Sequence, residues 1–405
     1  MLTHEVHTSE RKSFKGCRRR WDWHFRQNWT PIGAAPPLEF GIAYHKGMEV
    51  LYNPETWDWD REVVGELAVK TFVDECNKQR NTYLRETDAV ELEPAVQDDY
   101  DERIKLGKGM LRYYYREQLP KNPDGFRPVR VEISFEVPIN DPETGEQLMC
   151  KCNPCWERFY SLHANEPEFQ TTFAAHGKDK WVGLPVTYAG RIDALGEDDY
   201  GDYWIVDWKT ARALSEDEEF LQLDDQIGSY VWALRKVLGL PVRGFIYHEQ
   251  KKGFPQAPKM NKVNRLGCWF SVSKNQDTDY ETYLKTVKKE DPEAYESGAY
   301  DEFLDWLKRE GPAFYRRHVV FKNDHELTEI EKNIAYEAMD MIDPATRIYP
   351  NAGRFACKFC AFRQPCIGQN RGEEFSYTLR TLFKQEEPYY YRQARGASTE
   401  SKGGE

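Results

Sequence analysis

The sequence predicts a mixed α/β or α+β fold, with a central mixed sheet flanked by helices. Residues 126–139, 184–195 and 201–210 are rich in β-branched and aromatic side chains, and turn residues separate the last two segments. The amphipathic stretch 223–239 predicts a helix, and residues 242–250 predict a fourth strand. Helical segments precede this order of three strands, a helix and a strand, so we expect them to pack against the sheet.

The composition argues against a membrane protein and against secretion. Mean hydropathy is −0.80, and no apolar run approaches the ~20 residues that a spanning helix needs. The segment 1–17 lacks the apolar region of a signal peptide. Nine cysteines in such a chain predict a reducing compartment, the cytoplasm, where clustered thiols more often bind metal than form disulfides.

The net charge of −12 is unevenly distributed along the chain. Acidic residues concentrate at 86–102 and 216–225, whereas 11–26 and 251–265 are basic. This segregation is compatible with a basic channel on an acidic body, and equally with two solvated charged surfaces.

The chain is expected to form one domain over residues 1–391. Within it, residues 140–183 form an apparent insertion, and residues 250–345 form a helical and loop-rich elaboration. The tail 392–405 is rich in Gly, Ser and charged residues, which predicts disorder.

Three helices are expected before the sheet, at residues 38–53 and at about 61–84 and 98–118. In the first of them, His45 and Glu49 form a stripe beside the apolar face. Taken singly, a histidine in this position is more typical of a structural residue than of a metal ligand.

A predicted hairpin carries three charged side chains around which the chain is organised. Asp207 and Lys209 lie two residues apart and so project from the same face of a strand, and the hairpin brings Asp193 towards Asp207. The opposite face holds Trp204, Val206 and Trp208. Two carboxylates and a lysine at the end of a sheet predict a divalent-metal site, because hard cations prefer oxygen ligands. The alternative is a solvated charge pair across two strands.

The N-terminal segment combines a cysteine with arginines and aromatic residues. The spacing of Trp21, Phe25 and Trp29 predicts one helical stripe, which more often packs in a core. The candidates to bind phosphate in this segment are Arg18, Arg19 and Arg20.

Three cysteines near the C-terminus form a tight C-x2-C-x5-C group of Cys357, Cys360 and Cys366. A four-coordinate centre needs one more ligand, and the best candidate is Cys17. Joining the two ends would close a loop of about 340 residues and clasp the domain. Zinc and a [4Fe–4S] cluster both fit four thiolates, and four isolated buried cysteines are the alternative.

A second cysteine group lies in the insertion, with Cys150, Cys152 and Cys155 followed by His163. Three cysteines and a histidine can form a small zinc site. The C-x-C-x2-C spacing is crowded, however, and the histidine could be a loop residue only.

Five motifs, in order, resemble the PD-(D/E)XK nuclease superfamily. They are specifically similar to RecB-like exonucleases with an iron–sulfur clasp, a group that includes AddB-type nuclease domains and the exonucleases of CRISPR adaptation. AYHKGME is similar to the helical histidine motif, GRID to the first acidic motif, IVDWKT to the D/E-x-K motif and DQIGSY to the Q-x-x-x-Y helix. Cys17 with CKFCAFRQPC is similar to the split four-cysteine signature. The resemblance runs from Cys17 to Cys366, and the insertion has no counterpart in it.

The resemblance implies a restriction-endonuclease-like core and a role for each matching residue. The implied protein ligands of Mg²⁺ or Mn²⁺ are His45, Asp193, Asp207 and the backbone carbonyl of Trp208. Lys209 would orient the attacking water and stabilise negative charge on the scissile phosphate. Gln226 and Tyr230 share a helix face and would contact the DNA backbone, and the clasp cysteines would hold a structural [4Fe–4S] cluster. Aspartate at position 207 matches RecB-type members, whereas many other members have glutamate.

We therefore expect a metal-dependent DNA exonuclease that acts on ends or single strands in recombination, repair or replication. A recombinase or a single-strand annealing protein is a candidate partner besides DNA. The alternatives are a structure-specific endonuclease and a catalytically silent DNA-binding recombination factor. Retention of Asp193, Asp207 and Lys209 argues against the silent factor. No GxxxxGK[ST] segment occurs, so no P-loop motor is expected in this chain.

Overall fold

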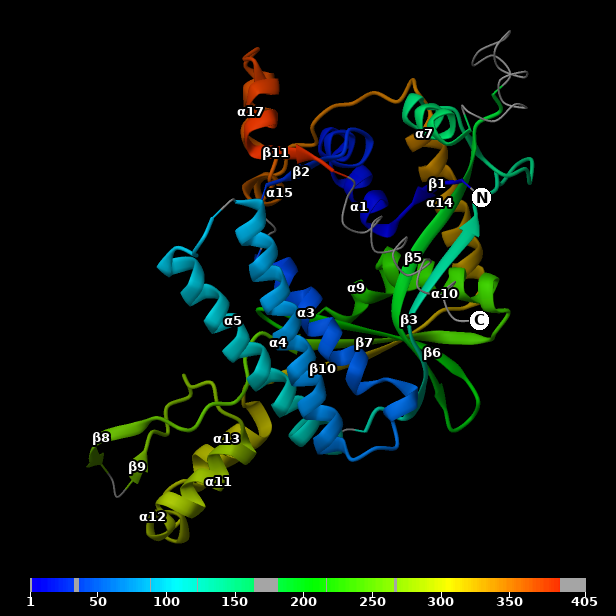
Figure 1. The fold of residues 1–405 in the computed structure, drawn as a ribbon. Coiled ribbons are helices and arrows are strands. Elements are labelled where there is room, and N and C mark those ends of the chain that lie inside the picture. Colours follow the sequence, from blue (N-terminus) through cyan, green and yellow to red (C-terminus); the bar gives the residue numbers. More distant parts are fainter. Residues whose placement is uncertain are drawn as a thin grey trace.

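The computed structural model describes residues 2–32, 36–87, 89–121, 123–163, 181–215, 217–265 and 268–386. A seven-stranded mixed sheet lies at its centre, and helices cover both faces of the sheet (Figure 1). The predicted fold class is therefore confirmed. The tail at 392–405, and part of the predicted insertion, lie outside the described residues.

The main sheet follows the order β1-β5-β6-β7-β10, and β3 and β4 also pair with β5. Its strands are β1 (His4–Val6), β3 (Phe126–Pro138), β4 (Met149–Cys150), β5 (Leu184–Asp198), β6 (Tyr203–Ala211), β7 (Val242–Lys251) and β10 (Tyr315–Phe321).

The predicted hairpin is present as the antiparallel pair β5–β6, in which Ala194 lies opposite Val206. The chain then crosses over through α10 (Asp225–Leu238), and β7 pairs with β6 in parallel. Asp224 begins α10, because its side chain accepts a hydrogen bond from the backbone N–H of Gln226. Gly239 ends the helix in the left-handed region, with a φ of 64°.

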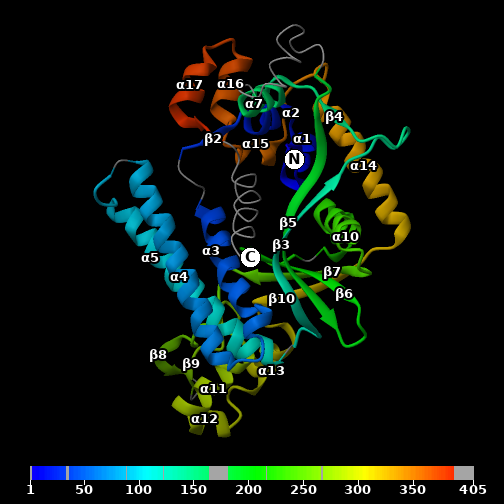
Figure 2. The same ribbon diagram turned by 45° about the vertical axis from the view of Figure 1, so that its right-hand side comes forward.

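Helices pack on the two faces of the sheet and form two cores (Figure 2). One face is covered by α1 (Thr8–Gly16), α10 and α14 (Asp324–Ile342), and the other by α3 (Pro36–Leu51), α4 (Arg61–Glu86) and α5 (Pro94–Tyr113). Ile205 of β6 packs in the first core, whereas Trp204, Val206 and Trp208 pack in the second. The alternation predicted for this strand is confirmed.

The shorter elements connect these layers or join the ends of the chain. They are α2 (Arg18–Trp21), η1 (Asp22–Arg26), β2 (Trp29–Pro31), η2 (Pro54–Thr56), η3 (Tyr114–Gln118), α6 (Leu119–Lys121), α7 (Asn153–His163), α9 (Glu218–Leu223), α15 (Arg354–Lys358), α16 (Arg363–Asn370), α17 (Phe375–Leu382) and β11 (Phe383–Gln385). None of the described helices is both long enough and apolar enough to cross a membrane.

The single helical stripe expected for Trp21, Phe25 and Trp29 is wrong. Helix α2 runs into the π-helix η1, whose extra residue per turn breaks the α-helical period, and Trp29 begins β2. Trp21 and Trp23 are the buried tryptophans of this segment. Strand β2 pairs with β11, so the two terminal segments lie side by side.

The elaboration predicted at 250–345 consists of two different parts. The first contains β8 (Met260–Arg265), β9 (Cys268–Phe270), α11 (Tyr280–Glu290), α12 (Pro292–Glu296) and α13 (Asp301–Glu310), which have a core of their own. The second part is β10 and α14, which belong to the sheet and its cover. The prediction was wrong there because Arg316 and Arg317 make this edge strand polar.

Candidate active site

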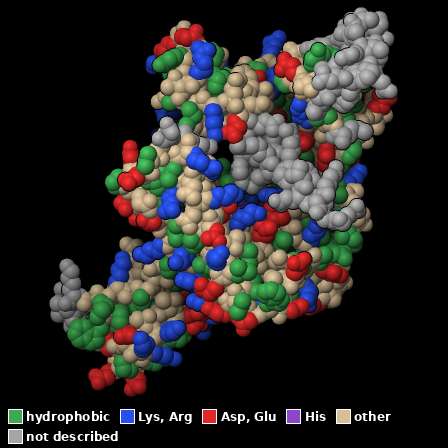
Figure 3. Space-filling model, in the orientation of Figure 1, with side chains coloured by type: hydrophobic (Ala, Val, Ile, Leu, Met, Phe, Trp, Pro, Cys, Tyr) green, Lys and Arg blue, Asp and Glu red, His purple; other side chains and the backbone are tan. Residues whose placement is uncertain are grey.

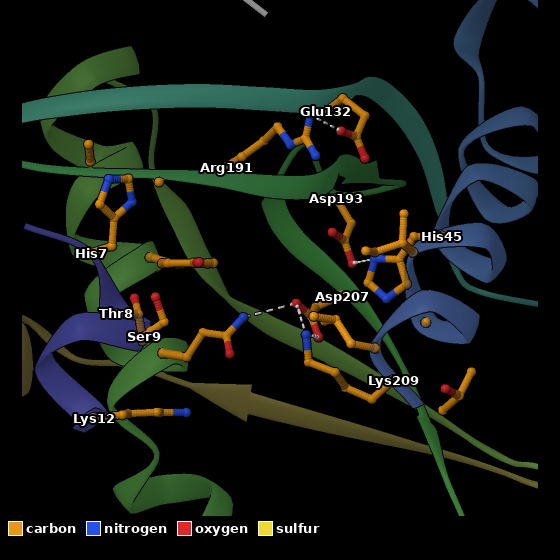
Figure 4. A pocket seen from close by; sticks show the side chains of 18 of the residues that line it. His7, Thr8, Ser9, Lys12, His45, Glu132, Arg191, Asp193, Asp207 and Lys209 are labelled. Atoms are coloured by element: carbon orange, nitrogen blue, oxygen red, sulfur yellow. Dashed lines mark hydrogen bonds and ion pairs between the residues drawn. The ribbon is translucent and has the colours of Figure 1, made fainter. Parts of the chain in front are cut away.

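A cavity of about 490 Å³ opens at the end of the β5–β6 hairpin, between α1, α3 and α10 (Figure 4). Six of the predicted site residues line it, namely His45, Asp193, Asp207, Lys209, Gln226 and Tyr230. The fold therefore brings together side chains from α3, β5, β6 and α10 that are distant in the sequence.

Asp193 connects the hairpin with α3. Continuing the β5–β6 register by one residue places it opposite Asp207. Its Oδ2 atom accepts a hydrogen bond from the backbone N–H of Trp208 at 3.1 Å and lies 3.3 Å from Nδ1 of His45. Burial alone would raise the pKa of Asp193, but the charge and hydrogen bond of His45, the charge of Lys209 and the Trp208 N–H together outweigh it and lower the pKa to about 2. The carboxylate is therefore ionised at neutral pH.

The same ion pair raises the pKa of His45. Burial alone would lower the pKa of His45, whereas the carboxylate of Asp193 raises it above the usual value for histidine. The imidazole and the carboxylate therefore stabilise each other's charged forms.

Asp207 is buried, with 3% of its surface exposed. Its Oδ1 atom accepts hydrogen bonds from Nζ of Lys209 at 2.8 Å and from Nε2 of Gln226 at 3.1 Å (Figure 4). Its Oδ2 atom lies 2.7 Å from the same ammonium, but accepts no hydrogen bond of acceptable geometry from the described residues. Burial raises the pKa of Asp207, and Lys209 opposes this shift. Burial would lower the pKa of Lys209, but Asp207 and Asp193 raise it, so the lysine is charged.

This set of donor atoms fits a hard divalent cation. Asp193 and Asp207 offer carboxylate oxygens, and His45 offers an imidazole nitrogen. Oδ2 of Asp207 is buried beside the Lys209 ammonium, and a carboxylate oxygen has lone pairs enough to bind a cation as well. Trp208 differs, because its side chain is buried in the second core and the residue does not line the cavity. The ligand role of its carbonyl stays a prediction.

Helix α10 places the two predicted DNA contacts on the cavity wall. Gln226 donates to Asp207, and the ring of Tyr230 packs edge-to-face on Phe135 with ring centroids 5.4 Å apart. Burial raises the pKa of Tyr230 well above its usual value, so the hydroxyl is neutral and can donate a hydrogen bond.

The three consecutive arginines lie away from the cavity. Arg18 stacks on the ring of Phe14 at 4.9 Å, and Arg19 donates to Sγ of Cys366 at 3.4 Å. Neither of them, nor Arg20, lines the cavity. Their role in binding phosphate stays a prediction.

The split cysteines predicted to form a clasp lie where the terminal segments meet. The β2–β11 pairing and a small core of Trp23, Phe362, Leu379 and Phe383 hold these segments together. Burial raises the pKa of the Cys360 thiol, and the neighbouring thiols of Cys17 and Cys357 raise it further. Cys360 and Cys366 both pack against the small core.

The cysteines of the insertion form a tighter group. Cys150, Cys152 and Cys155 lie with His4 so that one ligand atom from each is within 4.8 Å of all the others. The histidine in this group is His4 of β1, whereas the sequence suggested His163. The side chain of His163 lies outside the described part of the structure.

Glu132 and several residues near the N-terminus line the cavity but belong to no recognised motif. Nη1 of Arg191 lies 2.7 Å from Oε2 of Glu132, whose backbone takes a φ of 52° in β3. Burial raises the pKa of Glu132. The sequence shows Glu132 only as one of several charged residues alternating along a strand, which does not distinguish it from Glu136. His7, directly before α1, and Thr8, Ser9 and Lys12 of α1 also line the cavity, and all four precede the first recognised motif.

Comparison with known protein families identifies the same relationship as the motifs. The profile of the PD-(D/E)XK nuclease superfamily matches residues 8–367, which include every residue discussed in the cavity except His7. A search of individual curated proteins found no match. The match covers most of the chain and both sides of the hairpin that carries Asp193 and Asp207. The chain therefore belongs to the PD-(D/E)XK nuclease superfamily, whose members use divalent metals to cleave nucleic acids.

Proposed function

We propose that the protein is a Mg²⁺- or Mn²⁺-dependent DNA exonuclease of the RecB-like type. The observation that carries this proposal is the meeting of Asp193, Asp207 and Lys209 at one open cavity, with the buried carboxylate of Asp207 2.7 Å from the Lys209 ammonium. Phosphodiester hydrolysis is slow because the charge of the phosphate repels the nucleophile. Two carboxylates for a cation and a lysine for the phosphate address this barrier.

Each of the predicted site residues that line the cavity has one role in the proposed reaction. Asp193, Asp207 and His45 hold the divalent cation, which supplies positive charge and a more acidic water when bound. Nζ of Lys209 orients the attacking water and stabilises negative charge on the scissile phosphate. Gln226 fixes the carboxylate of Asp207 through its hydrogen bond, and Tyr230 offers a hydroxyl donor to the DNA backbone.

Basic side chains around the cavity support DNA as the substrate. Lys12, Lys46 and Arg191 line it together with Lys209. Lys and Arg side chains also gather near the centre of the face shown in Figure 3. Such groups bind phosphates without regard to sequence. A net charge of −12 does not oppose this, because binding depends on the charges near the cavity and not on the total charge of the chain.

We further propose that Cys17, Cys357, Cys360 and Cys366 hold a structural [4Fe–4S] cluster. The four thiols are not among the described groups whose ligand atoms all lie within 4.8 Å, the close spacing that a single zinc ion requires. A cubane cluster holds its cysteine sulfurs farther apart than a single zinc ion does, so wider spacing is compatible with iron–sulfur. The purified protein should be brown, with broad absorbance near about 400 nm. Stoichiometric zinc without iron after anaerobic purification would contradict the cluster.

The exonuclease proposal is tested with linear and covalently closed circular DNA of the same sequence in Mg²⁺. We expect progressive loss of the linear molecules, while the closed circles stay intact. Cleavage of closed circles would show an endonuclease instead. A matched protein with Asp207→Ala, purified in the same way, controls for contaminating nucleases.

The proposed place of the enzyme in recombination, repair or replication implies a partner that uses the strand it exposes. A recombinase or a single-strand annealing protein has that property. Co-purification with either protein on gapped DNA, but not on intact duplex, would support this assignment.

A further inference from the structure

A cluster of possible metal ligands lies outside the candidate active site, where the N-terminal strand meets the insertion. His4 of β1 comes together with Cys150 of β4, with Cys152 in the link that follows β4, and with Cys155 of α7. Both strands pair with the first residues of β5, His4 opposite Val186 and Cys150 opposite Leu184. The two strands flank β5, so the sheet places the imidazole and the first thiol on the same face without help from a metal.

The distances in this group match those of a tetrahedral zinc site. Sγ of Cys155 lies 3.6 Å from Sγ of Cys150 and 3.2 Å from Nδ1 of His4. Zinc–sulfur bonds of about 2.3 Å and a zinc–nitrogen bond of about 2.0 Å place tetrahedral ligands roughly 3.5–3.8 Å apart. The group is too tight for a cubane cluster, which separates its thiolates more widely.

The chemistry of the donors also selects zinc. Three thiolates and one imidazole are soft or borderline ligands, whereas Mg²⁺ and Mn²⁺ prefer oxygen. Four protein ligands complete a tetrahedron and leave no open position for water, which is typical of a structural site. Cys150 and Cys155 are buried, with 0% and 3% of their surfaces exposed.

The surroundings show what such a site would hold in place. The side chain of Arg158, on α7, donates to the backbone oxygen of Thr3 at 2.7 Å, and thus joins the insertion to the N-terminal strand beside the group. Trp181 of the insertion belongs to the first core, and Trp156 and Phe159 pack against that core, so the described part of the insertion lies on the edge of the main body.

The group lies directly before the part of α1 that forms one wall of the cavity. Val6 ends β1, and His7, Thr8, Ser9 and Lys12 follow it to line the cavity. Oγ1 of Thr8 lies 2.5 Å from the hydroxyl of Tyr188, which donates to Oγ of Ser229 on α10. A fixed β1 therefore fixes the start of α1 against α10, the helix that carries Gln226.

We propose that His4, Cys150, Cys152 and Cys155 bind one structural Zn²⁺ ion, which fastens the N-terminal strand to the insertion and thereby holds α1 at the wall of the active-site cavity. This centre is distinct from the split-cysteine clasp and from the divalent-metal site, and it does not depend on the nuclease assignment.

The test is the zinc and iron content of the purified protein, measured by elemental analysis. We expect about one zinc per chain from this centre, lost in Cys152→Ala and in His4→Ala, while the iron content stays unchanged. His4→Cys should retain the zinc, because a fourth thiolate replaces the imidazole. Cys76→Ala, at a buried cysteine outside both groups, is the matched control and should keep both metals.

A second measurement uses the unaltered protein and so does not depend on the variants folding. Titration with a thiol-modifying mercurial in the presence of a colorimetric zinc indicator should release about one equivalent of zinc from the native chain. Cys152→Ala should release no zinc from this site, whereas Cys357→Ser should release the same one equivalent of zinc as the native chain. Equal zinc contents in the native protein, His4→Ala and Cys152→Ala would overturn the proposal, as would a disulfide joining Cys150 and Cys155 in the native protein.

Discussion

Nδ1 of His45 on helix α3 lies 3.3 Å from Oδ2 of Asp193 on strand β5. The pair joins the helix that covers one face of the sheet to the hairpin that carries Asp207. Each partner favours the charged form of the other, since the pKa of His45 is raised and that of Asp193 is lowered to about 2. A bound cation would displace the proton of His45 and occupy the same space between these donors.

Removing one donor of this pair should weaken metal binding. We expect Asp193→Asn to raise the Mn²⁺ concentration for half-maximal cleavage by at least about tenfold, because a neutral amide is a poorer ligand than a carboxylate. Cleavage measured across a series of Mn²⁺ concentrations checks this. Glu197→Gln, on the same strand but outside the cavity, should leave the concentration unchanged. Identical metal dependence in all three proteins would remove Asp193 from the ligand set.

Loss of the ammonium of Lys209 should slow the chemical step without preventing binding. We expect Lys209→Met to lower kcat by about 10²–10³-fold, the usual effect of removing one group that stabilises transition-state charge. The Kd for DNA in Ca²⁺ should change little, because Lys12, Lys46 and Arg191 stay at the cavity. Single-turnover cleavage and a binding titration on the same sample separate the two effects. Lys236→Met, on α10 and paired with Glu331, is the control, and full cleavage by Lys209→Met would refute the assigned role.

The hairpin part of the site could be predicted from the sequence because its geometry is local. The two-residue period of a strand places Asp207 and Lys209 on one face, and a short turn returns the chain past Asp193. Periodicity alone did not place His45 or Gln226 there. Their arrival depends on how α3 and α10 cross the sheet, and only the resemblance to a family indicated it.

Other parts of the molecule could not be read from local patterns. His4 reaches the insertion cysteines because β1 pairs with β5. A strand of three residues is too short to show a two-residue period in the sequence. Glu132 reaches the cavity from a backbone position with positive φ, which is uncommon for a residue with a side chain. Strand β10 was missed because an edge strand tolerates the charges of Arg316 and Arg317.

A buried histidine should make the stability of the fold depend on pH. His248 is fully buried, with its Nδ1 atom 2.5 Å from the hydroxyl of Tyr315, and burial together with Arg317 lowers its pKa well below the usual value. The unfolded chain protonates this histidine below about pH 6.5, whereas the folded chain does not. Its contribution to stability is therefore fully present above about pH 6.5. It is lost as the pH falls, by up to about 1.4 kcal/mol per pH unit, until the folded pKa is reached.

His248→Gln should remove this part of the pH dependence. Urea unfolding at a series of pH values between about 7.5 and 5.5 gives the slope of the unfolding free energy for each protein. We expect a smaller slope in His248→Gln than in the native protein. The exposed His325 on α14 provides the matched variant His325→Gln, which should keep the native slope. A native slope in His248→Gln would show that other groups carry the acid sensitivity.

The helices that cover the second core should be sensitive to a single methyl group. A Cβ atom at Gly107 of α5 would lie 2.0 Å from Cζ of Phe72 on α4, closer than any real contact. We expect Gly107→Ala to lower the free energy of unfolding by about 1–3 kcal/mol, because overpacking outweighs the gain in helix propensity. At Gly41 of α3 a Cβ atom meets nothing within 4 Å, so Gly41→Ala should stabilise by about 0.5–1 kcal/mol. Urea midpoints measured side by side should therefore move in opposite directions. A stabilising Gly107→Ala would show that the ring of Phe72 gives way to the new methyl group, and a destabilising Gly41→Ala would show that the open space at Gly41 does not decide the effect there.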